Sequence, residues 1–125
     1  MLISTDGSKP IYVQIAEWLE NEILSDSINQ DEKIYSQYQL AEMFTINPAT
    51  AAKGLNLLAN EEILYKKRGL GMFVSSEAKA IILQKRKENM LEKLIKDLVL
   101  EANRLHVSEE ELIKMIKTVN KEDGE

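Results

Sequence analysis

Apolar residues recur three and four positions apart near the start of the chain, which is the spacing of a helix that buries one face. The repeat begins at Ile11 and continues to Leu24. Pro10 directly precedes it, and proline is pre-organised for a first helical turn. We therefore predict a helix that begins at about Pro10, followed by a polar loop over residues 25–31.

Two short helices separated by only about three residues are predicted next. Ser36 and Gln39 have the spacing of a capping box, in which each side chain bonds a free backbone N–H at the helix start. Asn47 is a strong N-cap, and Pro48 after it suits the first helical position. This helix should end near Asn60. Its core-facing residues are expected to be Ala51, Leu55, Leu58 and Ala59.

A hairpin follows the second of these helices. Residues 63–66 and 72–74 have the composition of short strands, and the turn between them contains Gly69 and Gly71. Glycine accepts the positive φ that such a turn requires. Two short helices followed by a hairpin are typical of a winged helix-turn-helix, so residues 1–76 are predicted to form that domain.

The remainder, residues 77–125, is predicted to be a two-helix tail. One long helix should run from about Glu77 to about Leu105, and Ser108 with Glu111 forms a second capping box before a final amphipathic helix. The overall class is thus mainly α (α+β).

Two amphipathic helices cannot enclose a core of their own. The apolar stripe of the tail must fold back on the first domain or pack on a second copy. We favour the second copy, because small DNA-binding proteins usually need two half-sites. The expected dimerisation residues are Leu83, Met90, Leu91, Leu94, Leu98, Leu105, Leu112, Met115 and Ile116.

Charge is unevenly distributed along the chain. The net charge is −5, and residues 1–78 hold 6 basic and 11 acidic side chains. Residues 63–74 nevertheless carry three cations, Lys66, Lys67 and Arg68, and no acid. Such a local basic tip suits a focused contact with phosphates and disfavours broad coating of DNA.

Composition excludes several classes of protein. With no cysteine and one histidine, the chain cannot build a thiol nucleophile, a cysteine zinc site or a histidine cluster. It has no P-loop and no GxGxxG, so we expect no enzyme, no metal and no cofactor. No apolar run approaches about 18 residues and no signal peptide is evident, so we expect a cytoplasmic protein without a membrane partner. Whether a small-molecule effector exists stays open.

Recognition helices place their first residues against base edges in the major groove. Thr50 is the best candidate reader, because its hydroxyl can donate and its methyl can meet thymine. Asn47 has a competing and favoured role as N-cap, and Lys53 is equally a phosphate contact or a solvated lysine. Lys66 and Lys67 should point to opposite faces of their strand. The expected DNA-binding residues are Ser36, Tyr38, Asn47, Pro48, Ala49, Thr50, Lys53, Lys66, Lys67, Arg68 and Gly69.

Four segments in register resemble the GntR family of bacterial transcription regulators. They are Pro10-Ile11-Tyr12-Val13-Gln14-Ile15, Ser36 with Leu40-Ala41, Ile46-Asn47-Pro48-Ala49-Thr50, and Gly69-x-Gly71-x-Phe73-Val74. The short tail is similar to that of the YtrA subfamily. The resemblance implies a winged helix, a dimerising tail and a palindromic operator in double-stranded DNA. It also implies a repressor, because YtrA-like regulators often repress operons that encode ABC transporters.

The chain departs from the family pattern at three positions. Tyr38 replaces an arginine that grips a phosphate, and Pro48 and Ala52 stand where arginines are common, although Asn-Pro is itself YtrA-like. These losses, the acidic net charge and the alanine-rich recognition helix, with Ala49, Ala51 and Ala52, leave a second hypothesis open. In it, the winged helix binds another protein and has lost tight DNA binding.

Overall fold

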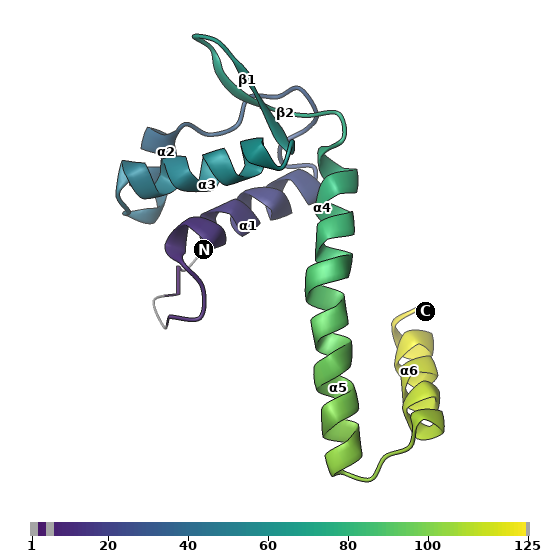
Figure 1. Cartoon of the computed structure of the whole chain (residues 1–125). Coiled ribbons are helices and arrows are strands. Elements are labelled where there is room, and N and C mark those ends of the chain that lie inside the picture. The colour runs from purple at the N-terminus through teal and green to yellow at the C-terminus, as the bar shows by residue number, and fades with distance from the viewer. Residues whose placement is uncertain (1–2, 5–6, 125) are drawn as a thin grey trace. The chain divides into compact units, whose positions relative to one another are not determined.

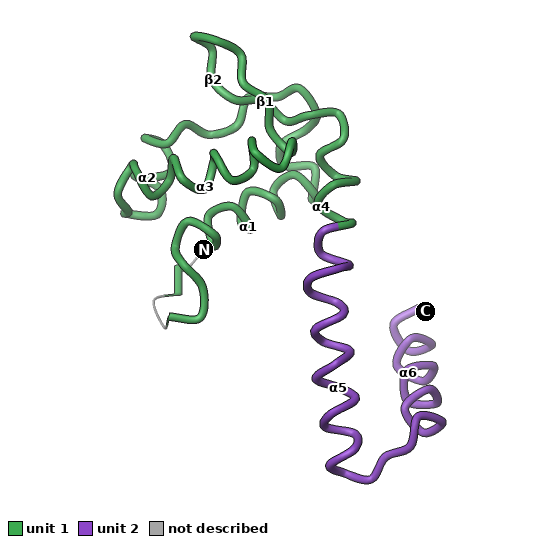
Figure 2. The backbone as a smooth tube through the Cα atoms, viewed as in Figure 1, with its two compact units in different colours: residues 1–84 green, residues 85–125 purple. Residues whose placement is uncertain are grey.

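A computed structural model of the chain describes residues 3–4 and 7–124, which form two compact units, residues 1–84 and residues 85–125 (Figure 2). The elements in chain order are α1 (Ile11–Leu24), α2 (Gln37–Phe44), α3 (Pro48–Asn60), β1 (Leu64–Lys67), β2 (Gly71–Val74), α4 (Ala78–Arg86), η1 (Lys87–Leu91), α5 (Glu92–Arg104) and α6 (Glu109–Asp123) (Figure 1). The predicted fold class, a mainly helical winged helix-turn-helix with a helical tail, is confirmed.

The first unit is built on α3, which packs against both α1 and α2. The apolar spacing of these helices directs one face of each inward. The large apolar side chains that the first unit buries most completely are Ile15, Leu19, Ile23, Leu40, Leu58, Ile63, Val74 and Ile82. Ala51 and Leu55 also lie in this core, as expected. Trp18 packs at its edge, with its ring 5.0 Å from that of Phe44 in an edge-to-face arrangement.

Side-chain caps set the starts of the two short helices. Gln39 N–H donates to Ser36 Oγ at 3.1 Å, and Ser36 N–H donates to Gln39 Oε1 at 2.8 Å, so the predicted capping box is confirmed. At α3, Ala49 N–H donates to Asn47 Oδ1 at 2.8 Å, and Pro48 occupies the first helical position. These caps satisfy backbone donors that a helix start leaves free.

The wing is an antiparallel pair of strands in which Leu64 faces Val74 and Lys67 faces Gly71. A short segment, residues 31–34, pairs with the other edge of β2. Ile34 N–H donates to Met72 O at 2.9 Å on that edge. The local sequence does not predict a strand here, because the segment is too short and too charged to show an alternating pattern.

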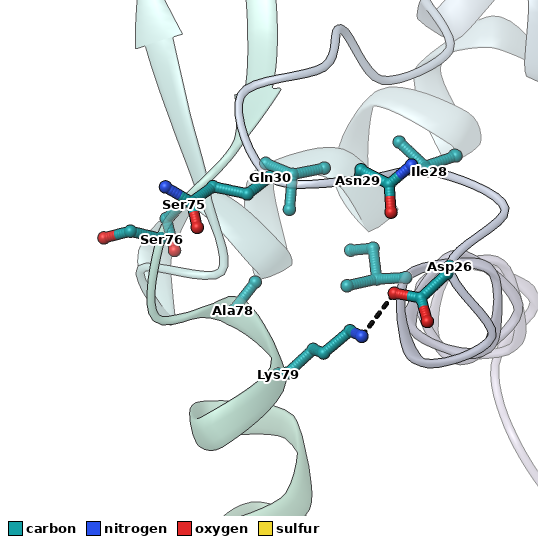
Figure 3. A pocket seen from close by; sticks show the side chains of 10 residues that line it. Asp26, Ile28, Asn29, Gln30, Ser75, Ser76, Ala78 and Lys79 are labelled. Atoms are coloured by element: carbon teal, nitrogen blue, oxygen red, sulfur yellow. Dashed lines mark hydrogen bonds and ion pairs between the residues drawn. The ribbon is translucent and has the colours of Figure 1, made fainter.

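The first compact unit ends at Gln84, beyond the expected domain end at residue 76. The reason is packing: Ala78 and Ile82, in the first turns of α4, are buried in its core. Lys79 of the same helix forms an ion pair with Asp26, which follows α1 (Figure 3). Both residues of this ion pair line a cavity of about 290 Å³ that is bounded by polar and apolar side chains alike.

The second unit consists of helices that bury little. The prediction of one regular α-helix from about residue 77 to about residue 105 is wrong in one respect. A π-helical turn, η1, separates α4 from α5 at Lys87–Leu91. Ser108 caps α6 by accepting from Glu111 N–H at 3.1 Å. Of the described residues in this unit, Ala102 alone is buried. Throughout the described ranges, no helix combines the length and apolar content needed to cross a bilayer.

Candidate nucleic-acid interface

The wing exposes three cations at the end of β1 and in the glycine-containing turn that follows it. Gly69 and Gly71 have φ values of 78° and 111°, a region that disfavours residues with a Cβ. Lys66, Lys67 and Arg68 are exposed, and within the described ranges none of them forms an ion pair. Their charge is therefore not neutralised by the protein itself.

The two lysines of β1 occupy opposite faces of the hairpin, as alternation along a strand requires. Lys66 faces Met72 across the pair, whereas Lys67 faces Gly71. The Lys67 ammonium lies 4.6 Å from the centre of the Phe73 ring, a cation–π distance. Lys67 is thus held over an aromatic side chain.

Tyr65 ties the hairpin to the segment at residues 31–34. Its hydroxyl donates to Asp31 Oδ1 at 2.7 Å, and its ring stacks with Phe73 at a centroid distance of 5.9 Å. The hydrogen bond to Asp31 raises the pKa of Tyr65 above its ordinary value of 10.0, and desolvation and the negative charge of Asp31 act in the same direction.

A cleft of about 350 Å³ brings the start of α2 together with the tip of the wing. Ser36 and Tyr38 line it on one side, and Gly69, Leu70 and Gly71 line it on the other. Tyr38 is 69% exposed, so its ring contributes little to the core. Three of the predicted contact residues, Ser36, Tyr38 and Gly69, therefore share one surface.

Five other predicted contact residues lie on or next to the first turns of α3 and do not line this cleft: Asn47, Pro48, Ala49, Thr50 and Lys53. Ala49 is exposed and Thr50 is partly exposed, while Asn47 forms the cap described above. The ammonium of Lys53 lies 4.2 Å from the centre of the Tyr12 ring on α1. That contact depends on how α1 and α3 pack, so the local sequence does not predict it.

The tail presents most of its apolar side chains to solvent within a single chain. Of the predicted dimerisation residues, Leu112 is partly exposed and the others are exposed; Leu83 belongs to the first unit. A groove of about 380 Å³ within the second unit is lined by Leu98, Leu112, Met115, Ile116, Val119, Asn120 and Asp123. The prediction omitted several further exposed apolar residues, Ile95, Val99, Leu100, Ile113 and Val119, although their helical spacing was visible.

The described part of the chain contains no group of three or more histidine, cysteine or acidic side chains arranged to hold a metal ion.

Comparison with known proteins identifies relatives of the whole chain, although no family model matches it. The HTH-type transcriptional repressor YtrA of Bacillus subtilis (strain 168) is 30% identical over 118 residues, which cover 94% of this chain and 90% of that protein. A crystal structure of a GntR-family transcriptional regulator from Bacteroides thetaiotaomicron superposes with a TM-score of 0.77 at 30% identity, covering 90% of this chain and 98% of that one.

A third relative matches little more than half of the chain. The DNA-binding domain of AraR, crystallised in complex with operator ORX1, matches with a TM-score of 0.53 and 28% identity over 58% of this chain and 87% of that one. The assignment to a family depends on the first two relatives, because their matches extend over both the winged helix and the tail. This chain therefore belongs to the GntR family of transcriptional regulators, as a YtrA-like member.

Proposed function

We propose that this protein is a repressor that binds a specific operator in double-stranded DNA as a homodimer. The observation that carries the proposal is the wing: three exposed, unpaired cations on an otherwise acidic first domain, next to a capped helix-turn-helix. Three relatives are named as transcriptional repressors, and the DNA-binding domain of AraR was crystallised with an operator.

The elements of the first unit suggest a division of roles on DNA. Thr50, in the first turn of α3, is proposed to read a base edge in the major groove. Arg68 at the tip of the wing is proposed to enter the minor groove, where a narrow groove strengthens the negative potential. Ser36 and Tyr38, which share the cleft with the wing, are proposed to contact phosphates between these two points.

Homodimerisation is supported by the exposed apolar side chains of the tail. The second unit buries only Ala102 among its described residues, whereas Leu94, Leu98 and Ile116 are at least 43% exposed. A contiguous apolar surface of this kind on a small helical unit marks a protein contact. A two-fold dimer would present two winged helices to two half-sites, so the proposed operator is palindromic.

The regulated genes are proposed from the family resemblance, which favours an operon encoding an ABC transporter. A duplex from the region upstream of the gene for this protein is the first probe to test, together with the regions upstream of its neighbours. If a neighbouring transporter operon exists and the duplex from its promoter does not bind the protein, this part of the proposal is wrong.

The competing hypothesis is a winged helix that binds another protein. It is favoured by the net charge of −5 and by Tyr38 and Ala52, which stand where the family carries arginines. The alanine-rich recognition helix also favours it, but this support is weaker in the structure. Ala51 is fully buried and would not face DNA in any case. The alanine content of α3 is thus partly a packing requirement.

Fluorescence anisotropy with the upstream duplex at rising salt distinguishes the two hypotheses. For the repressor, we expect affinity to fall steeply with salt, and Arg68→Ala should reduce the slope of log K against log salt by about one unit. Thr50→Ala should cost about 1–3 kcal/mol on the operator and much less on an unrelated duplex. Wild-type binding that is absent, or insensitive to salt, would favour the protein-binding hypothesis.

A further inference from the structure

The first 78 residues contain six lysines and arginines, and the structure accounts for each of them. Lys9 is paired with Glu17 at 2.9 Å, and Lys53 lies over the Tyr12 ring. Three of the remaining four are the wing cations already described. The sixth is Lys33, which precedes α2 in the sequence. Its neighbours in the chain form no motif that predicts a role in DNA binding.

Strand pairing brings Lys33 to the wing. Lys33 lies opposite Phe73 on the free edge of β2, and the flanking bonds run from Ile34 N–H to Met72 O and from Val74 N–H to Glu32 O. This pattern makes Lys33 and Phe73 a non-hydrogen-bonded pair, in which side chains approach most closely and project from the same face. Lys67 is held over that same Phe73 ring from the other side of β2.

The side chain of Lys33 then runs along the wing to its turn. A Cβ built on Gly71 would lie 2.9 Å from Cε of Lys33 and 3.7 Å from its Nζ, so the lysine passes over the space that a side chain at this position would occupy. Gly71 thus serves two purposes. It adopts the positive φ of the turn, and it leaves room for the lysine.

The charge of Lys33 is available to a ligand. Within the part of the chain that the structure describes, its ammonium has no hydrogen-bonded or ion-paired partner. The two acids beside it are engaged elsewhere: Asp31 accepts from the Tyr65 hydroxyl, and Glu32 accepts from Asn29 N–H at 2.7 Å. Four of the six cations in this region therefore gather on one hairpin and the segment paired with it.

We propose that Lys33 is a phosphate-contacting residue of the DNA interface, placed at the wing by its pairing with β2 and by the open position at Gly71. The inference rests on the proposed function, because its ligand is the DNA backbone. Lysine acts at phosphates as a point charge without base specificity, so Lys33 is expected to support affinity for any duplex and not to select a sequence.

The test compares three purified variants by anisotropy on the upstream duplex and on an unrelated duplex, over about 50 to 200 mM salt. Lys33→Gln should lower the slope of log K against log salt by about 0.9, the value for one phosphate. The wild-type advantage over this variant should then shrink about 3.5-fold across that range, on both duplexes. Lys33→Arg retains the charge and should preserve the slope.

Lys79→Gln is the matched control, because it removes the same charge from α4, where Lys79 is paired with Asp26 and not with the wing. Its slope should equal that of the wild type. If the wild type binds with a salt-dependent slope and Lys33→Gln does not differ from Lys79→Gln, Lys33 is not a phosphate contact, although the proposed function stands. If Lys33→Arg lowers the slope of log K against log salt as much as Lys33→Gln does, while its circular dichroism is unchanged, the charge of Lys33 is not the cause. The inference then also fails. If the wild type binds neither duplex, the proposed function fails first.

Discussion

Gly54→Ala tests the closest approach between two helices of the first unit. Gly54 lies in the middle of α3 and is buried. A Cβ at this position would be 2.9 Å from the backbone carbonyl oxygen of Tyr12 and 3.3 Å from Cγ2 of Ile15, both on α1. The first contact is with a backbone atom and the second with a fully buried side chain, so neither can swing aside.

Two opposing terms set the magnitude. In an unconstrained helix, replacing glycine with alanine stabilises by about 1 kcal/mol, because glycine loses more backbone entropy on folding. Here the added methyl overpacks a closed interface, which costs about 1–3 kcal/mol. Since α1 must shift as a unit to relieve the contact with Tyr12, we expect the packing term to prevail. The net result should be a loss of about 1 kcal/mol in the free energy of unfolding.

Urea denaturation followed by circular dichroism, at one protein concentration throughout, measures this difference. Asn56 provides the reference, because it is exposed on the same helix and the pair Asn56→Gly and Asn56→Ala reports helix propensity without packing. Alanine should be the more stable residue at position 56 and the less stable one at position 54. Stabilisation at both positions would refute the close packing of α1 on α3.

Three other perturbations have definite expected outcomes. The raised pKa of Tyr65 means that the folded wing holds this proton more tightly than the unfolded chain, so the hydrogen bond stabilises below pH 10.0 and is lost as pH rises through the raised pKa. A phenolate absorbance titration should show its last step missing in Tyr65→Phe and shifted downward in Asp31→Asn; an unshifted step would contradict the bond. Ser36→Ala removes the cap of α2 and should lower the free energy of unfolding by about 1 kcal/mol, measured by urea denaturation. An unchanged free energy of unfolding would show that the cap does not stabilise the fold. Replacing Leu94 and Leu98 with glutamate should give monomers in sedimentation velocity, and an unchanged sedimentation coefficient would remove the dimer from the proposal.

Features that depend on neighbours in the chain were predictable from the sequence. The capping box of Ser36 and Gln39 and the Asn47-Pro48 start of α3 require only local hydrogen bonds and the fixed φ of proline, and both were predicted correctly. The glycine turn of the wing was equally visible, because a positive φ limits the residues that can occupy it. The family pattern then added the identity of the fold, and the full-length relatives confirmed it.

Features that depend on distant segments were decided by the tertiary structure. No local pattern showed that Lys33 would reach the wing, because its position depends on pairing with a strand that comes later in the chain. The cation–π contact of Lys53 and the requirement for glycine at position 54 both follow from the packing of α1 against α3. Helical spacing and capping specify which elements form, whereas the charges and side chains that share a surface are selected only when those elements pack together.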